Sequence, residues 1–385
     1  MTELQDESVN MARKPIRVLV IDDSRLVREL IVDLLSLHAD LVIAGTAGDG
    51  DEGLRALEEL QPDVLTLDLQ MPRRDGLATL DAILERRPTP VIVVSSLTQR
   101  SAESAVEALE RGAMDYLAKP EGLDAMRQAF GEELPSKIRN MAGIDVGHVL
   151  HVRKARQQRL AAMATGLVRN ADENSIARNA AGCIAIGVST GGPPALTRLF
   201  QNLEPPLPPI VVVQHMPETF TTTFAKRLDG LSKLNVKEAA DGDVLRPNCV
   251  YVAPGGKQLA VRRRGESGVI EVRDGEYVSG HKPSVDVMMR SVSMIYGNRA
   301  IGVIMTGMGR DGADGCRAIR DGGGFVLGQD EESSDVYGMN KVAWTEGGVD
   351  LQVPLDRLSE AIVVRVGQLP GHRRAAASQL TPAAL

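Results

Sequence analysis

Short runs of β-branched and aliphatic residues alternate with amphipathic helical segments along this chain, and the alternation occurs twice. Strands that alternate with helices in this way are typical of parallel sheets joined by crossover helices. A chain of 385 residues also exceeds what one hydrophobic core usually serves. The sequence therefore predicts an α/β protein with two doubly wound domains, each with its own core.

The first alternation predicts a (βα)5 domain over residues 15–130, preceded by an N-terminal extension over residues 1–14. Its expected strands are Arg17–Ile21, Val42–Ala47, Val64–Asp68, Val91–Ser95 and Asp115–Leu117. Leucines recur at helical spacing after the first of these runs, so the helix predicted there has one apolar face toward the sheet.

The second alternation predicts a mainly parallel, three-layer α/β/α domain over residues 181–368. Its expected strands are Cys183–Val188, Ile210–Gln214, Cys249–Ala253, Ile301–Met305 and Gly324–Leu327. Val261–Arg264 and Val269–Arg273 flank a Gly and Ser turn and predict a β-hairpin. Residues 131–180 are polar and basic without strand signals, so we expect a linker, partly helical at Lys154–Met163, and a flexible tail over 369–385.

Composition excludes several classes of protein. The net charge of −7 argues against a nucleic-acid partner, because proteins that bind nucleic acids normally present a basic face to the phosphates. No apolar run approaches the ~20 residues that cross a bilayer, so we expect no membrane insertion. The first residues are acidic where a signal peptide would be basic, which favours the cytoplasm. Three widely spaced cysteines predict neither a disulfide framework nor a zinc site.

Polar side chains stand at the ends of the strands predicted in the first domain, and these are Asp22, Asp23, Asp68, Ser95 and Lys119. Because the carboxyl ends of parallel strands meet at one edge of a sheet, we expect these side chains to converge. Clustered carboxylates repel one another unless a hard cation neutralises them. The cluster therefore predicts a Mg²⁺ site suited to phosphoryl transfer.

Three segments of the first domain resemble the receiver domain of two-component response regulators. They are Val18–Ser24, Leu67–Gly76 (LDLQMPRRDG) and Tyr116–Pro120 (YLAKP). The resemblance implies that Asp68 is the phosphoacceptor. It further implies that Asp22, Asp23 and Asp68 bind Mg²⁺, with the backbone carbonyl of Gln70 as an additional ligand.

The same resemblance implies that Ser95 and Lys119 contact the phosphoryl oxygens. Tyr116 matches the aromatic switch position, whose rotation is coupled to movement of the serine in that family. The alternative interpretation of Tyr116 is a half-buried strand tyrosine with no signalling role.

A Gly-x-Ser-x-Gly motif, Gly187–Gly191, follows directly on the first strand predicted in the second domain. Glycines on both sides of Ser189 let the backbone turn sharply and let a substrate carbonyl approach, with backbone N–H groups facing its oxygen. Pro193 and Pro194 suit the first turn of a following helix. The motif alone is a weak signal, and a phosphate-binding loop is the competing interpretation.

A serine hydroxyl needs a base to become a nucleophile near neutral pH. His215 follows the strand Ile210–Gln214, so two adjacent parallel strands would bring it to Ser189. His281, in a polar loop, is the alternative base. Asp311 in the glycine-rich segment MTGMGRDGADG supplies an acid, and Asp314 is the weaker candidate.

The order serine, histidine, aspartate differs from that of the α/β-hydrolases. The second domain instead resembles the catalytic domain of chemotaxis protein-glutamate methylesterases, through the segments STGGPPAL, VVVQHMP, YVAPGG, HKPSVDV and TGMGRDGADG. The resemblance implies a triad of Ser189, His215 and Asp311, with Thr190 and Met308 lining the site. It implies hydrolysis of glutamate γ-methyl esters on chemoreceptors, with release of methanol and without a cofactor, and deamidation of selected glutamines.

Taken together, the two resemblances imply an esterase activated by phosphorylation of Asp68, with methylated chemoreceptors as substrates and a chemotaxis-type histidine kinase as phosphodonor. Two alternatives stay open. The same chemistry could serve a sensory pathway other than flagellar chemotaxis, or the second domain could be an interaction module without catalysis.

Overall fold

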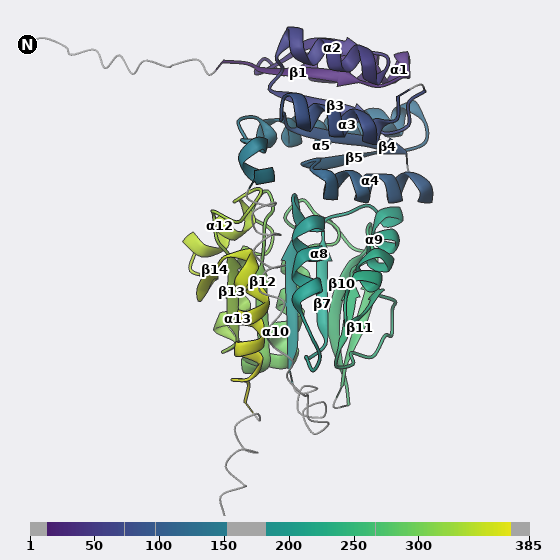
Figure 1. The fold of residues 1–385 in the computed structure, drawn as a ribbon. Coiled ribbons are helices and arrows are strands. Elements are labelled where there is room, and N and C mark those ends of the chain that lie inside the picture. The colour runs from purple at the N-terminus through teal and green to yellow at the C-terminus, as the bar shows by residue number, and fades with distance from the viewer. Residues whose placement is uncertain (1–13, 73, 97, 152–181, 266, 371–385) are drawn as a thin grey trace, which may run out of the picture. The chain divides into compact units, whose positions relative to one another are not determined.

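The computed structural model describes residues 14–72, 74–96, 98–151, 182–265 and 267–370. Separate parts of the chain build two parallel sheets, and an antiparallel pair of strands accompanies the second (Figure 1). The two α/β domains expected from the alternating pattern are confirmed. None of the described helices combines the length and the apolarity that a membrane span requires.

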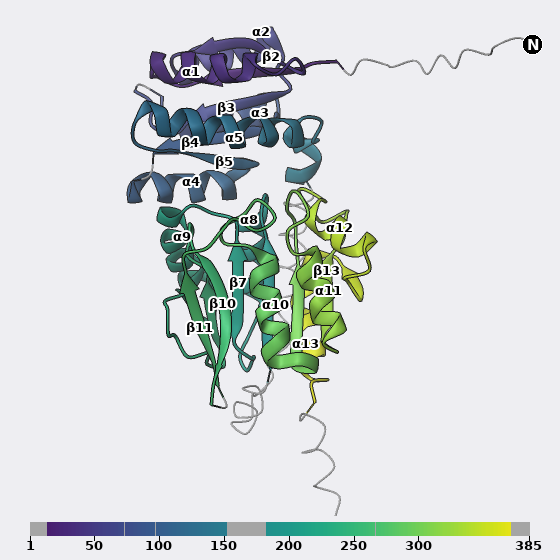
Figure 2. The ribbon, with the colours of Figure 1, turned by 180° about the vertical axis from the view of Figure 1, so that it is seen from behind.

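The first sheet has five strands in the order β2-β1-β3-β4-β5. The elements are β1 (Ile16–Ile21), α1 (Arg25–Ser36), β2 (Leu41–Ala47), α2 (Gly50–Leu60), β3 (Val64–Asp68), α3 (Gly76–Arg86), β4 (Val91–Ser96), α4 (Gln99–Arg111), β5 (Asp115–Lys119) and α5 (Leu123–Met141). Figures 1 and 2 show α1 and α5 on one face of this sheet and α2 and α3 on the other. The strand order reverses between β1 and β3, which is where open α/β sheets bind ligands.

Helix α5 continues well past residue 130, where the linker was predicted to begin. Leu134, Ile138 and Met141 are fully buried and extend the apolar face of the helix, which packs against α1. Arg139 near its end forms a two-pronged ion pair with Asp40, at 2.6 and 2.9 Å. The first part of the predicted linker is therefore packed helix, while the helix expected at 154–163 lies outside the described residues.

The second sheet has seven strands in the order β14-β13-β12-β6-β7-β9-β8. The elements are β6 (Cys183–Val188), α8 (Gly192–Asn202), β7 (Ile210–Gln214), α9 (Glu218–Leu231), β8 (Asn235–Glu238), β9 (Cys249–Val252), β10 (Gln258–Arg264), β11 (Ser267–Arg273), α10 (Val285–Tyr296), the 3₁₀ helix η1 (Gly297–Arg299), β12 (Ala300–Ile304), α11 (Ala313–Asp321), β13 (Phe325–Gln329), α12 (Met339–Thr345), β14 (Leu351–Val353) and α13 (Leu355–Val366). The predicted hairpin is confirmed as β10 and β11.

The edge strands β8 and β14 were not predicted. They have only four and three residues, and neither presents the continuous apolar run that marks the buried strands. Figure 1 shows α8 and α13 in front of the sheet, and Figure 2 shows α10 and α11 on the opposite face. Leu369, which was expected in the flexible tail, is buried beside Gly182 near the end of the described residues.

The centre of the second sheet is the strand β6, which is buried along its whole length. On one side of β6 lie β7, β9 and β8, and the chain then crosses to the other side to add β12, β13 and β14. The carboxyl end of β6 is therefore the point at which the sheet changes direction, and a binding crevice is expected there.

Candidate active site and phosphoacceptor site

The three residues predicted as a catalytic triad follow three neighbouring strands. Ser189 comes directly after β6, His215 directly after β7, and Asp311 lies in the loop between β12 and α11. Backbone hydrogen bonds continue the sheet beyond the strand ends, because Ser189 N–H donates to Thr306 O at 3.0 Å and His215 N–H donates to Val188 O at 3.2 Å. The register of the sheet thus brings the three residues together.

The turn after β6 has little room for side chains. Gly191 has a φ of +76°, the left-handed conformation that glycine adopts without strain. A Cβ on Gly192 would lie 1.9 Å from Oε1 of Gln214. The Nε2 of Gln214 donates to the carbonyls of Ser189 and His215, at 2.9 and 3.2 Å, and so links the two strand ends. Helix α8 then starts with prolines in its first turn, as the sequence predicts.

His215 and Asp311 form a direct hydrogen bond of 2.8 Å between Nε2 and Oδ2. The other ring nitrogen, Nδ1, is buried without a hydrogen-bond partner among the described residues. Ser189 stands at the neighbouring strand end without a hydrogen bond from its hydroxyl to this ring. Catalytic hydrogen bonds are often long or misaligned in ligand-free sites, so this geometry is compatible with proton transfer to Nδ1.

The Asp311 carboxylate is fully buried and rests on the N-terminus of α10. Its Oδ1 accepts from the Ser284 hydroxyl at 2.8 Å and from the N–H of Asp286 at 3.0 Å, and its Oδ2 accepts from the N–H of Val285 at 2.7 Å. Burial by itself would raise the pKa of Asp311, but the bonds from His215 and from these N–H groups lower it below its ordinary value. Asp311 therefore stays ionised.

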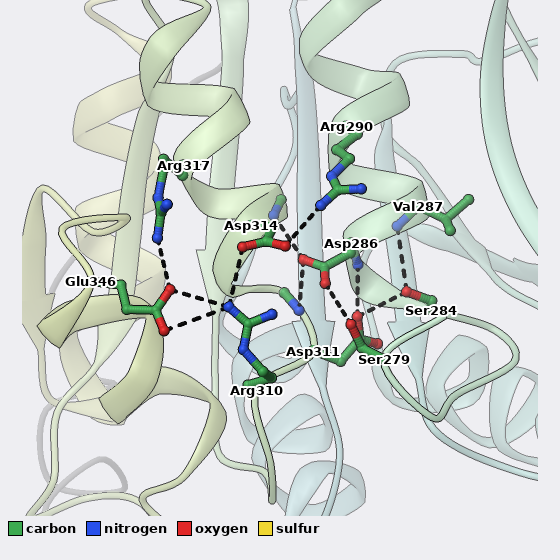
Figure 3. Close-up of polar contacts among 12 residues, drawn as sticks. Ser279, Ser284, Asp286, Val287, Arg290, Arg310, Asp311, Asp314, Arg317 and Glu346 are labelled. Carbon is green, nitrogen blue, oxygen red and sulfur yellow. Dashed lines mark hydrogen bonds and ion pairs between the residues drawn. The ribbon is translucent and has the colours of Figure 1, made fainter. Parts of the chain in front are cut away.

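A second buried carboxylate, that of Asp286 in α10, is bound in the same way by the N-terminus of α11 (Figure 3). Its Oδ1 accepts from the N–H groups of Gly312 and Gly315, at 3.0 and 2.7 Å, at the start of α11. The N-terminus of α10 therefore binds Asp311, which precedes α11, and the N-terminus of α11 binds Asp286, which lies in the first turn of α10. Both carboxylates are stabilised by the positive end of a helix dipole. Burial raises the pKa of Asp286, and the nearby Asp311 charge acts in the same direction.

These contacts were not predicted from the sequence. Ser284 in front of the apolar run VDVMM is a recognisable helix N-cap signal, and its side chain does accept from the N–H of Val287. Nothing in the local pattern reveals that Asp311, distant in the chain, shares this helix end. Asp314, the weaker candidate acid, instead pairs with Arg290 at 2.9 Å and Arg310 at 3.2 Å on the surface (Figure 3).

The remaining predicted residues of this site occupy the same strand-end region. Thr190 follows Ser189, and its carbonyl accepts from the Thr306 hydroxyl at 2.9 Å. Met308 lies in the loop after β12, three residues before Asp311. His281, the alternative base, lies flat against the ring of His215 with 3.6 Å between ring centroids. The roles assigned to these side chains stay predictions.

The acidic residues of the first domain also converge. Oxygen atoms of Asp22, Asp23 and Asp68 lie within 4.8 Å of one another. Lys119 Nζ lies 2.6 Å from Oδ2 of Asp22 and 2.6 Å from Oδ2 of Asp68. Burial, assisted by the Asp68 charge, raises the pKa of Asp22 even though Lys119 opposes the shift. Burial alone would lower the pKa of Lys119, but the two carboxylates raise it.

The other predicted residues of this cluster lie on the expected strands. Ser95 is fully buried near the end of β4, beside the end of β3. Gln70 follows the phosphoacceptor candidate by two residues, and its N–H donates to Oδ1 of Asp68 at 2.9 Å. Tyr116 lies in β5. Clustered carboxylate oxygens are the ligands that Mg²⁺ prefers, so the three acidic residues fit the ion.

Comparisons with known proteins cover both domains. Residues 18–131 match the response regulator receiver domain, and residues 184–362 match the CheB methylesterase family. The chain is 41% identical over 350 residues to protein-glutamate methylesterase/protein-glutamine glutaminase 1 of Geobacter metallireducens, covering 90% of this chain and 95% of the relative. It is 44% identical over 362 residues to protein-glutamate methylesterase/protein-glutamine glutaminase 4 of Anaeromyxobacter dehalogenans, covering 94% and 98%.

Among solved structures, the CheB methylesterase catalytic domain of Thermotoga maritima is 38% identical and covers 48% of this chain and 97% of its own, with a TM-score of 0.46. The two relatives align with this chain over at least 90% of its length, and the two family models match both of its domains. The chain therefore belongs to the CheB methylesterase family and combines its catalytic domain with a response regulator receiver domain.

Proposed function

We propose that this protein hydrolyses γ-methyl esters of glutamate on methylated chemoreceptors, releasing methanol, and that phosphorylation of Asp68 raises this activity. The observation that carries the proposal is the hydrogen bond between His215 and the buried Asp311, at the strand end next to Ser189. Family membership supports the substrate class, because the relatives are named for this activity. The same site would deamidate glutamine side chains, since ester and amide hydrolysis share a tetrahedral intermediate.

In this mechanism Ser189 Oγ attacks the ester carbonyl while His215 takes the hydroxyl proton. Because Nε2 is engaged by Asp311, Nδ1 is the nitrogen that accepts this proton. His215 then returns the proton to the departing methoxide, which leaves as methanol, and water hydrolyses the acyl group in the reverse sense. The ionised Asp311 stabilises the imidazolium at both stages.

Charge also develops on the carbonyl oxygen during the attack. The N–H groups of Ser189 and Gly192 already donate within the protein, to Thr306 O and Ser189 O. We assign the oxyanion donors to the next backbone groups of the turn, the N–H of Thr190 and of Gly191. Donors fixed by a tight turn need no rearrangement as the charge forms, which is where such sites gain most of their effect.

In the receiver domain, Asp22, Asp23 and Asp68 would hold Mg²⁺, which supplies charge neutralisation for phosphoryl transfer. Asp68 accepts the phosphoryl group through the oxygen that now faces Lys119. Lys119 and Ser95 then contact the phosphoryl oxygens, and Tyr116 acts in the switch. A chemotaxis-type histidine kinase is the phosphodonor we propose, with the cytoplasm as the site of action.

The test is methanol release from methylated receptor membranes, with and without a small phosphodonor and Mg²⁺. We expect release to rise on treatment with the phosphodonor. The Ser189→Ala protein should release no methanol yet still become phosphorylated, whereas Asp68→Ala should keep the basal release and lose the rise. Absence of methanol in every state of the wild-type protein, or near-normal turnover by Ser189→Ala, would refute the proposal.

A further inference from the structure

A second histidine packs on the proposed catalytic base. The rings of His215 and His281 are parallel to within 7°, with 3.6 Å between their centroids. At this separation the two rings are in van der Waals contact over their faces. His281 comes from the loop between β11 and α10, which is distant along the chain from the end of β7 that carries His215.

The contact matters because His215 has few other restraints on its ring. Its one side-chain hydrogen bond joins Nε2 to Asp311 at 2.8 Å, and Nδ1 has no hydrogen-bond partner among the described residues. A single hydrogen bond fixes one atom of the ring, but the ring can still tilt about that contact. A flat surface against one face limits the tilt and keeps Nδ1 in a defined direction.

The turn that carries His281 is itself held rigidly. Val278 and His281 exchange backbone hydrogen bonds of 3.1 and 2.9 Å across a two-residue turn. Its central residues, Ser279 and Gly280, have φ values of +51° and +80°, as a type I′ turn requires. The Nε2 of Gln258, on β10, donates to the carbonyl of His281 at 3.2 Å.

The same turn is tied to the residues that hold Asp311. The Ser279 hydroxyl donates to Oδ2 of Asp286 at 3.0 Å, and the backbone N–H of Asp286 donates to Asp311 (Figure 3). Residues 278–286 therefore supply both the ring against His215 and the donors around its acid partner. One short segment thus restrains the histidine from its face and from its hydrogen-bonded edge.

We propose that His281 is a positioning residue, which fixes the ring plane of His215 so that Nδ1 stays directed at the Ser189 hydroxyl. This inference rests on the proposed function, because His281 is assigned the orientation of the histidine that takes the proton from Ser189. His281 exchanges no proton in the reaction. Its role is the flat aromatic surface, and another aromatic side chain should replace it.

The kinetic test compares three variants in methanol release. His281→Ala removes the surface, and we expect kcat to fall about 10- to 100-fold with little change in KM, the scale of loss that a small misplacement of a catalytic group produces. His281→Phe keeps a flat ring and should restore kcat to within about threefold of wild type. Tyr277→Ala is the matched control, because this exposed aromatic residue of the same loop contacts Lys282 and should leave kcat unchanged.

A second readout does not depend on turnover. In wild type the ring-current field of His281 should shift the NMR signals of the His215 ring protons upfield. That shift should persist in His281→Phe and vanish in His281→Ala, while circular dichroism and the melting temperature stay close to wild type. If the wild-type protein released no methanol, the proposed function would fail, and these shifts alone would decide whether His281 positions the ring.

Four results would overturn the inference. His281→Phe as inactive as His281→Ala would mean that the imidazole itself is required. A higher KM with normal kcat in His281→Ala would make His281 a substrate contact, and normal kinetics in that variant would leave it without a role. His215 ring signals that do not respond to either substitution would show that the rings do not stack in solution.

Discussion

Each sheet of this protein has a buried carboxylate at or beyond the carboxyl end of a parallel strand, but the charges of the two carboxylates are compensated by different groups. Asp68 faces the Lys119 side chain and two further carboxylates, and it accepts one backbone hydrogen bond, from the N–H of Gln70. Asp311 faces His215 and the N-terminus of α10, where two backbone N–H groups and the Ser284 hydroxyl donate to it. A carboxylate that must accept a phosphoryl group needs partners that can move, whereas one that must orient a histidine and stabilise its transient charge benefits from donors that cannot.

The largest effect should come from Asp311→Asn. The amide cannot stabilise the imidazolium, and it presents an N–H₂ group toward backbone donors, so kcat should fall about 10⁴-fold. Methanol release under saturating substrate measures this. Asp314→Asn is the matched control, since that acid lies three residues further on, in the first turn of α11, and pairs with the exposed Arg290 and Arg310. Equal activity of the two variants would remove Asp311 from the mechanism.

Next in size is the loss of regulation in Asp68→Asn. The wild-type rate should rise on phosphorylation by about 5- to 150-fold, the usual range of coupling between two sites. The variant should keep the unstimulated rate, because Asp68 takes no part in ester hydrolysis. Methanol release before and after treatment with a phosphodonor measures both. A full response in the variant would mean that the phosphoryl group acts elsewhere.

Removal of Mg²⁺ should affect the function of the Asp68 cluster and leave that of the Asp311 site unchanged. Asp22→Asn should weaken Mg²⁺ binding by at least about tenfold in calorimetric titration, because it removes one charge from the cluster. Chelation of Mg²⁺ should abolish the phosphodonor response and leave the basal esterase rate unchanged. Asp311→Asn should bind Mg²⁺ like wild type. A basal rate that falls with the chelator would contradict the division of roles between the two sites.

The smallest effect concerns the end of α5. The hydrogen bond from Arg139 lowers the pKa of Asp40 to about 2. In Arg139→Gln, NMR titration should find this pKa near its ordinary value of about 3.9. Because the folded-state pKa is depressed, the stabilisation is present above about pH 4 and is lost as the pH falls through about 2. Wild type and variant should therefore converge in melting temperature at low pH, and an unchanged Asp40 titration would contradict the pairing.

Much of this arrangement follows from local pattern. The strands β1, β3, β6 and β7 are short, mainly apolar runs typical of a buried parallel sheet, and the polar residues that follow them were expected to converge. The missed features lack such a pattern. The strands β8 and β14 are too short, and α5 continues through Pro135 into a segment whose polar composition suggested a linker.

The sequence by itself determined the two α/β domains, the acidic cluster around Asp68 and the proximity of Ser189, His215 and Asp311, because strand ends in parallel sheets share an edge. Only the tertiary structure decided how Asp311 is held and which surface His215 rests on. Both depend on residues 278–286, which lie distant in the chain from each of these partners. Contacts of this kind arise from the packing of α10 against the sheet, and no local periodicity encodes them.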